Sequence, residues 1–174
     1  TPVRGYIRYC EKEKEIRVHS PVISPDLMAV FHQALLKDKS TWNGCDEHTD
    51  IIVGLDAGQG TLEEAAFTKW KKCYVVEAQK IAMETRSRIN MVMLGAIVRV
   101  MGFARLEDAN RICEDTLGKK CPEALKGNLE GIRRGYEEVR EMTDIPRKPS
   151  DSFRSETIEW GYDTAPAGGI NPCF

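Results

Sequence analysis

The segment Gly54-Leu55-Asp56-Ala57-Gly58-Gln59-Gly60-Thr61 is the stretch that most resembles a ligand-binding motif. It follows an apolar run, and Thr61 to Glu64 has the pattern of a capping box that opens a helix. A strand, a glycine-rich turn and a helix N-terminus can together bind a phosphate. The segment lacks both Gly-x-Gly-x-x-Gly and Gly-Lys-Ser/Thr, so we favour a structural turn over a nucleotide site.

The histidines and aspartates give no catalytic pattern. His19, His32 and His48 are scattered without metal-ligand spacing, and no Ser/His/Asp order is evident. We expect each histidine to be a surface or hydrogen-bonded residue. Asp50 and Asp56 flank one apolar run, and we interpret them as loop and capping groups rather than as an acid/base pair.

Six cysteines are present, but none forms a Cys-x-x-Cys pair: Cys10, Cys45, Cys73, Cys113, Cys121 and Cys173. An iron–sulfur cluster held by this chain alone would need four ligands brought together from distant positions. We therefore expect the chain to bind no cluster by itself. With no signal peptide visible, we expect most cysteines to be reduced residues of a cytoplasmic protein.

Charge is almost balanced along the chain. The 174 residues include 25 Lys and Arg against 27 Asp and Glu, a formal net charge of −2. This balance argues against a nucleic-acid partner, which requires a basic surface.

The run Ile89–Met101 has only Asn90 and Arg99 as clearly polar residues, which predicts a helix buried inside the protein. Thirteen helical residues rise only about 20 Å, which is too short for a membrane span. We expect Asn90 to cap the first turn, Gly95 to admit a neighbouring backbone, and Gly102 to end the helix in a left-handed conformation.

Strands and helices are predicted to alternate before this run. The segments 5–10 and 16–23 indicate an antiparallel hairpin around a charged turn, and 27–31 a strand covered on both faces. The remaining predicted elements are a short helix at 33–39, strands at 50–56 and 73–78, and helices from 61 to about 72 and from 80 to 85. This order favours an α/β fold with three layers: a mostly parallel, Rossmann-like sheet with helices on both faces.

Two amphipathic helices follow. Leu106, Ala109, Cys113 and Leu117 form the buried side of the first, with Glu107 and Asp108 in its first turn and Gly118 after its end. The second begins near Pro122, and one helical stripe holds Leu125, Leu129, Ile132, Tyr136 and Val139.

The composition changes after Met142, where prolines and glycines become frequent and the apolar pattern loses its period. We therefore predict a domain over residues 1–142 and an extended C-terminal arm over 143–174. Aromatic residues such as Trp160 and Phe174 indicate that the arm docks on another surface.

Several segments in this order resemble one protein family. Asn90-Met91-Val92-Met93-Leu94-Gly95-Ala96, the turn 102–106, and Asn128-Leu129-Glu130-Gly131 to Arg134-Gly135-Tyr136 resemble the C-terminal half of the gamma subunit of 2-oxoacid:acceptor oxidoreductases. Pro2 to Arg8 and the segment 20–26 resemble its middle strands, so the resemblance covers most of residues 1–142. The resemblance also implies that a glycine-rich strand, turn and helix precede Thr1 in the family.

The resemblance implies a role in a larger complex. Members of this family decarboxylate a 2-oxoacid on thiamine diphosphate with Mg²⁺, pass electrons through [4Fe-4S] clusters to ferredoxin or another acceptor, and release an acyl-coenzyme A. The expected partners are thiamine-binding alpha and beta subunits and an iron–sulfur subunit, which carry these cofactors. We expect this non-redox chain to pack on the catalytic subunits and to contribute no catalytic residue or metal ligand.

The resemblance also makes Arg4 and Arg8 candidate binding residues. The gamma part lies near the thiamine diphosphate site in the family and has been linked to coenzyme A, so a guanidinium there could meet a phosphate or carboxylate. The alternative is that both arginines are solvated strand residues.

Two other functions stay open from the sequence. One is a free-standing Rossmann-type domain that binds a small molecule at the turn 58–61, and the other is a purely structural scaffold subunit. The 2-oxoacid also stays open: pyruvate is the commonest expectation, with phenylglyoxylate or oxalate as alternatives.

Overall fold

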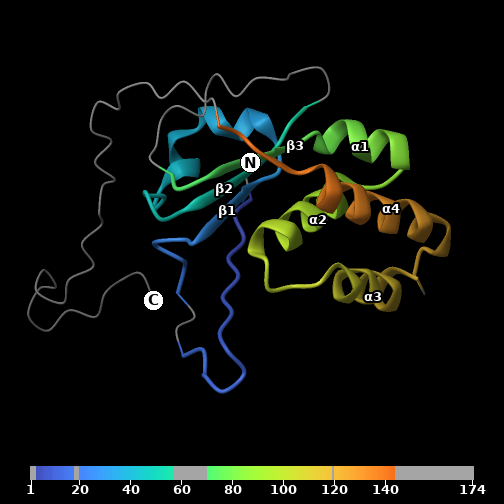
Figure 1. Ribbon diagram of the computed structural model, residues 1–174, viewed down its shortest axis with the longest axis horizontal. Coiled ribbons are helices and arrows are strands. Elements are labelled where there is room, and N and C mark those ends of the chain that lie inside the picture. Colours follow the sequence, from blue (N-terminus) through green and yellow to red (C-terminus); the bar gives the residue numbers. More distant parts are fainter. Residues whose placement is uncertain (1–2, 18–19, 57–69, 119, 144–174) are drawn as a thin grey trace, which may run out of the picture.

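The computed structural model describes residues 3–17, 20–56, 70–118 and 120–143 (Figure 1). Strands, α-helices and two short 3₁₀ helices occur in this part of the chain. In order they are β1 (Leu27–Val30), η1 (Gln33–Lys37), η2 (Lys39–Trp42), β2 (Asp50–Gly54), β3 (Cys73–Val76), α1 (Ala78–Thr85), α2 (Ile89–Met101), α3 (Leu106–Leu117), α4 (Pro122–Glu138) and β4 (Arg140–Glu141).

The strands form one mixed sheet in the order β1-β2-β3-β4. The first three strands are parallel, with Val30 opposite Val53 and Val53 opposite Val75. The two-residue strand β4 pairs antiparallel with β3, so that Arg140 lies opposite Val75. The predicted mostly parallel α/β sheet is therefore confirmed, and the short antiparallel edge strand was not predicted.

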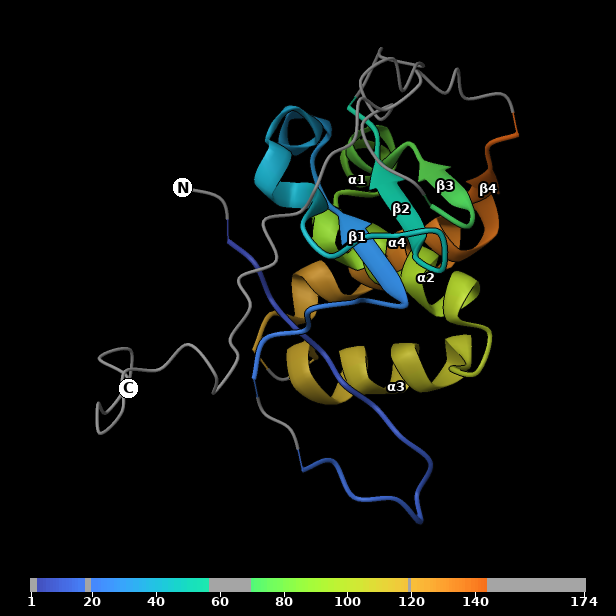
Figure 2. The same cartoon turned by 90° about the vertical axis from the view of Figure 1, so that its left-hand side faces the viewer.

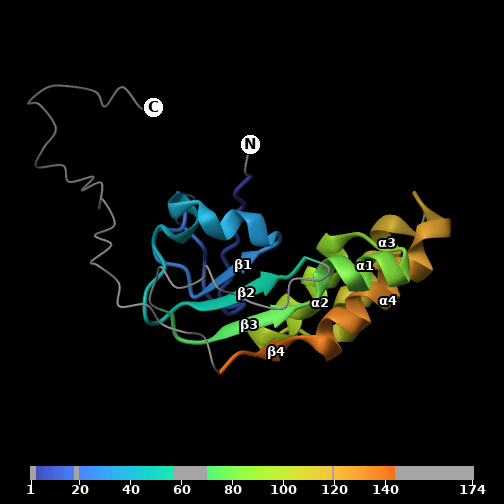
Figure 3. The same cartoon turned by 90° about the horizontal axis from the view of Figure 1, so that it is seen from above.

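Each face of the sheet packs into its own apolar core, because side chains alternate along a strand. On β2, Ile51 and Val53 pack with Leu36 and Trp42 of the 3₁₀ helices. Ile52 belongs to the opposite core, which includes residues of α1 and α2. Both faces are thus covered, one by 3₁₀ helices and the other by α-helices, and Figure 3 shows the four α-helices gathered together.

Helix α2 joins the sheet to the outer helices. Its buried Val92 and Met93 pack in the core under the sheet, whereas Val98 packs with Ala109 and Cys113 of α3 and Ile132 of α4. The prediction of a central apolar helix is confirmed over Ile89–Met101, although Asn90 and Arg99 are exposed. The predicted stripes of α3 and α4 face the same outer core, except that Val139 lies just beyond α4 and packs in the core under the sheet.

Glycines allow α2 and α4 to pack with their backbones in contact. A methyl group on Gly95 would collide with the carbonyl oxygen of Ile132, and one on Gly135 would collide with the carbonyl oxygen of Val92. The predicted role of Gly95 is therefore confirmed. Gly131 and Gly135 are buried in the same contact, one helical turn apart.

Helix ends follow the predictions only in part. Gly102 ends α2 with φ of +72°, the left-handed conformation that glycine favours. The predicted capping role of Asn90 is wrong: Arg88 occupies the N-cap position without a side-chain cap, and Asn90 lies inside the first turn. Pro122 begins α4, and Gly118 follows α3 with φ of −57° rather than in a left-handed conformation.

The N-terminal segment departs most from prediction. Residues 3–17 and 20–23 contain no strand, so the predicted hairpin is wrong where the structure describes it. Its turn is present, since the Lys14 amide donates a hydrogen bond to the Glu11 carbonyl over 2.9 Å. Figure 2 shows the segment as an extended excursion from the sheet. An isolated two-stranded ladder is marginally stable, which explains why the turn forms without it.

Some predictions fall outside the described residues. They include the helix from Thr61, whose last three positions, 70–72, are described and lead into β3 without helix. The C-terminal arm also lies outside, apart from its first residue, and so does His19. None of the described helices has the length and apolar character needed to cross a membrane.

Candidate functional site at the carboxyl ends of the strands

The carboxyl ends of β1, β2 and β3 lie at one edge of the sheet because the three strands are parallel. Ligands of open α/β sheets bind at this edge, just beyond the strands. Here His32 follows β1 and Asp56 follows β2, and His32 Nδ1 lies 3.1 Å from Asp56 Oδ1. The edge therefore holds a carboxylate–imidazole pair.

This pair is held by its local backbone. His32 is the residue that precedes η1, and its carbonyl accepts a hydrogen bond from the Leu35 amide over 3.0 Å. About half of the His32 side chain and a quarter of the Asp56 side chain are exposed. His32 is thus the hydrogen-bonded surface histidine that the sequence predicts, but its pairing with Asp56 depends on the sheet and could not be predicted.

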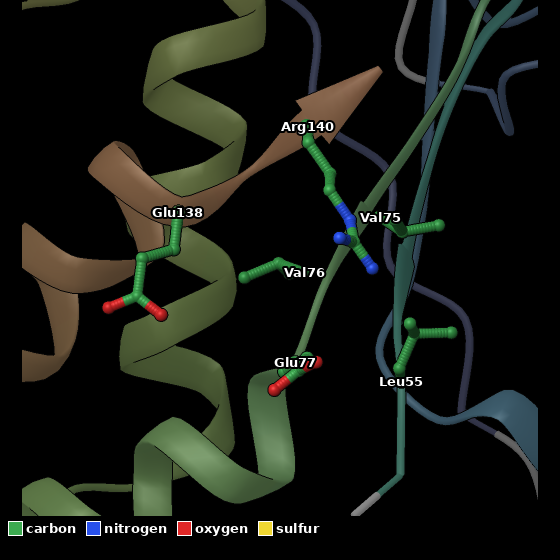
Figure 4. Close-up of a pocket in the computed structure, with 6 residues that line it drawn as sticks. All are labelled: Leu55, Val75, Val76, Glu77, Glu138 and Arg140. Atoms are coloured by element: carbon green, nitrogen blue, oxygen red, sulfur yellow. The ribbon is translucent and has the colours of Figure 1, made fainter. Parts of the chain in front are cut away.

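A small cavity lies beside this edge (Figure 4). It has a volume of about 160 Å³ and is lined by Leu55, Val75, Val76, Glu77, Glu138 and Arg140. Lys80 donates to Glu77 over 2.9 Å, and this hydrogen bond lowers the pKa of the Glu77 carboxyl. Pockets for drug-sized ligands measure about 300 to 1,000 Å³, so the cavity is too small for a nucleotide or coenzyme A.

The glycine-rich segment contributes a packing residue. A methyl group on Gly54 would come within 2.9 Å of Met93 Sδ and 3.0 Å of the Phe31 carbonyl oxygen. Gly54 is therefore explained by the close contact of β2 with β1 and α2. Residues 57–61 lie outside the described part, so neither the structural turn that we favoured nor a phosphate site there is tested.

Arg4 and Arg8 both bind backbone carbonyls. Arg4 Nη2 donates to the carbonyl of Ser40 in η2, and Arg8 Nη2 donates to the carbonyls of Ser20 and Pro21 over 2.9 and 3.0 Å. Both residues are exposed. Arg4 attaches the N-terminal segment to η2, and Arg8 connects two parts of the segment itself. The sequence did not predict either role.

The remaining candidates form no common site. Asp50 and Asp56 lie at opposite ends of β2, and the His48 amide donates to Asp46 Oδ1 over 2.8 Å. Within the described ranges no group of three or more His, Cys, Asp or Glu residues is arranged to hold a metal ion.

The five described cysteines are free thiols: Cys10, Cys45, Cys73, Cys113 and Cys121. Burial raises the pKa of Cys73 to about 12. Burial and the nearby Asp46 raise that of Cys45 to about 11. These two thiols are therefore poor nucleophiles at neutral pH.

Comparison with known proteins identifies the family. The profile described as "Pyruvate ferredoxin/flavodoxin oxidoreductase" matches residues 1–138. The chain is 35% identical over 147 residues to the pyruvate synthase subunit PorC of Thermotoga maritima, a match that covers 80% of this chain and 72% of PorC. The chain belongs to this family.

Other relatives agree with this assignment. The common gamma subunit of pyruvate/ketoisovalerate oxidoreductases of Pyrococcus abyssi is 27% identical, with 80% of this chain and 74% of the relative covered. The gamma subunit of NADH-dependent phenylglyoxylate dehydrogenase of Aromatoleum evansii is 29% identical, with 79% and 70% covered. The resemblance to gamma subunits of 2-oxoacid oxidoreductases is thus confirmed.

The fold also matches a solved member of the family. The crystal structure of Thermotoga maritima PORC superposes with a TM-score of 0.59 at 30% sequence identity, and the match covers 70% of this chain and 67% of PORC. The α/β architecture described above is therefore that of a gamma-type subunit.

Proposed function

We propose that this chain is the gamma subunit of a thiamine diphosphate and iron–sulfur dependent 2-oxoacid:acceptor oxidoreductase. The complex oxidatively decarboxylates a 2-oxoacid, passes electrons to ferredoxin or another acceptor, and forms an acyl-coenzyme A. The observation that carries this proposal is the family match over residues 1–138, together with 35% identity to a pyruvate synthase subunit. The chain itself is proposed to be a non-redox component of a cytoplasmic complex.

The N-terminal segment supports a role in assembly. Ten large apolar residues of the described chain are exposed, and six of them lie between residues 3 and 23: Val3, Tyr6, Ile7, Tyr9, Ile16 and Ile23. Ile7 is 88% exposed and Val3 is 94% exposed. Clustered apolar exposure of this kind marks protein interaction sites, and we propose that the alpha, beta or iron–sulfur subunit covers it.

Contacts along this segment hold it in place for assembly. Arg4 donates a hydrogen bond to Ser40, and Arg8 donates to residues 20 and 21. The ring of Tyr9 packs on the ring of Phe103 in the turn after α2, with 4.2 Å between the two ring centroids. An extended segment that is already anchored loses less conformational freedom when a partner binds.

Substitution of Ile7 tests the assembly role. Ile7→Asp places a charge in the proposed interface and should abolish copurification with the partner subunits, because a buried, unpaired charge is costly. Met83→Asp is the matched control, since Met83 is an exposed apolar residue of α1. Intact assembly of the Ile7→Asp variant would contradict this use of the segment.

Coenzyme A binding is proposed for Arg4, with Arg8 as a second candidate. Each guanidinium carries five donors, and the hydrogen bonds above use one nitrogen of each, so donors stay available for a phosphate. The cavity at the sheet edge is too small for coenzyme A, which favours a surface contact of this kind.

Kinetics of the assembled complex test the Arg4 role. Arg4→Ala should raise the KM for coenzyme A, and Arg4→Lys should recover part of the loss because it keeps the charge. Arg17→Ala is the control, as Arg17 is exposed and paired with Glu15. Unchanged coenzyme A affinity and turnover in Arg4→Ala would remove Arg4 from the proposal.

Purification of the native complex tests the proposed function as a whole. The complex should contain thiamine diphosphate and iron, and the chain alone should contain neither. An activity screen with pyruvate, phenylglyoxylate and oxalate then identifies the 2-oxoacid. A monomeric chain that binds a nucleotide would favour the free-standing domain, and full turnover without the chain would favour a scaffold.

A further inference from the structure

Among the described residues that line the cavity at the sheet edge, Arg140 is the only cation. It lies in β4 opposite Val75 of β3, and Figure 4 shows its side chain extending across the cavity toward the end of β2. The pairing of β4 with β3 sets the position of the Arg140 backbone, and its side chain is exposed. The strand therefore places the guanidinium at the mouth of the cavity, where it is open to solvent.

The two carboxylates that line the cavity have other partners. Glu77 accepts a hydrogen bond from Lys80 over 2.9 Å, and Glu138 forms an ion pair with Arg134. The charge of Arg140 also contributes to the lowered pKa of Glu77, after the larger effect of Lys80. Among the residues that the structure describes, Arg140 has no hydrogen bond or ion pair. Its planar fork of donors is thus available to a ligand that enters the cavity.

Shape and lining restrict the class of that ligand. Leu55, Val75 and Val76 form an apolar wall beside the guanidinium. The volume of about 160 Å³ admits only a small molecule. A carboxylate can accept two parallel hydrogen bonds from the fork while a short hydrocarbon chain covers the wall. Inorganic phosphate has no apolar part to make the second contact.

We infer that this cavity is a binding site for a small carboxylate, held by Arg140 at one end and by the apolar wall at the other. All the lining residues that the structure describes come from this chain, so the inference does not rest on the proposed reaction. The site is also separate from Arg4 and Arg8, which bind the carbonyls of other segments.

Titration of the full chain with propionate tests the site. Saturable NMR shifts are expected for the methyl groups of Val75 and Val76 and for the Arg140 Nε–H. Arg140→Gln removes the charge and the guanidinium fork but keeps a polar side chain, and it should weaken propionate binding roughly tenfold or more. Arg140→Lys should weaken it less, because the charge stays and the fork is lost.

Matched controls separate this site from general anion binding. Arg111→Gln should leave propionate affinity unchanged, since Arg111 pairs with Asp108 on the distant helix α3. Propionamide has the shape of propionate without its charge and should give no saturable shifts. Equal binding of propionamide, tighter binding of inorganic phosphate than of propionate, or unchanged propionate affinity in a folded Arg140→Gln variant would each overturn the inference.

Discussion

The contact between α2 and α4 and the N-terminal segment 3–23 represent opposite ways of using apolar residues. In the first, Ile132 and Val92 are fully buried, and glycines bring the two helix backbones together. In the second, Val3 and Ile7 are almost fully exposed, and residues 3–17 make no strand. In the first region the two helices bury each other's apolar side chains. In the second, apolar side chains stay exposed to solvent in the described part of the chain.

This difference separates residues that stabilise the chain from residues that we propose to serve assembly. Substitutions in the helix contact should lower the free energy of unfolding of the chain itself. Substitutions in the N-terminal segment should leave it nearly unchanged and act on the complex. Pairs of identical substitutions in the two regions test this separation directly.

Truncation of isoleucine should give the largest difference. Ile132→Ala removes a fully buried side chain and should lower the free energy of unfolding by about 2 to 5 kcal/mol. Ile7→Ala should change it by less than about 0.5 kcal/mol, because Ile7 is 88% exposed. Denaturant unfolding measures the free energy of unfolding of both variants. Equal decreases in the two variants would contradict the proposed separation of the two regions.

Addition of one methyl group should give the next largest effect. Gly135→Ala should destabilise the chain by about 1 to 3 kcal/mol, since the new methyl would overlap the Val92 carbonyl oxygen in the facing helix. Gly5→Ala is the control, because nothing lies within 4 Å of the added methyl there. A stabilised Gly135→Ala variant would mean that helix propensity outweighs the close contact.

Cysteine reactivity should separate the N-terminal segment from the buried sheet. Cys10 is exposed in the N-terminal segment and should react with iodoacetamide at pH 8, whereas buried Cys73 should react only after unfolding. Mass spectrometry of the labelled native chain identifies the modified residues. Labelling of Cys73 at the same rate as Cys10 would contradict the burial described above.

The raised pKa of Cys73 also sets a pH dependence. Above pH 9 the unfolded chain loses the Cys73 proton, while the folded chain keeps it until pH is about 12. The unfolded state then binds fewer protons, so the free energy of unfolding should fall as pH rises through this interval. Cys73→Ala should make this fall shallower, as measured by denaturant titrations at pH 8 and 10.

The smallest effect is expected at Asn90. Asn90 is exposed and is not the N-cap of α2, so Asn90→Ala should change the free energy of unfolding by less than about 0.5 kcal/mol. A loss of about 1 kcal/mol or more in thermal unfolding would instead favour the capping role that the sequence predicted.

Much of the fold could be predicted from the sequence because its signals are local. The apolar runs of β2 and β3, the periodic helices and the glycine at position 102 each have a pattern that one type of structure explains. The N-terminal hairpin was predicted by the same reasoning, and the described residues of this segment form no strand. Alternating apolar residues indicate strand, but a strand also needs a partner, and a local pattern does not supply one.

The candidate site was harder to predict because it depends on neighbours in space. His32 and Asp56 are distant in the sequence and meet only because β1 and β2 are parallel and in register. Arg140 is placed beside the cavity by the two-residue strand β4, which pairs antiparallel with β3. A strand of two residues is too short to give a recognisable pattern of apolar residues in the sequence. By contrast, the spacing Gly127-x-x-x-Gly131-x-x-x-Gly135 is visible in the sequence and indicates close packing along one side of α4.

The exposed turn after Cys10 has a consequence for the lifetime of the protein. Lys12 and Lys14 lie in exposed, irregular backbone next to the apolar segment, which is the kind of site that trypsin-like proteases cleave first. A copy without partners should therefore be cut there before the helical region opens. Degradation of surplus subunits would then begin at the same segment that assembly protects, which would keep the subunits of a complex in matching amounts.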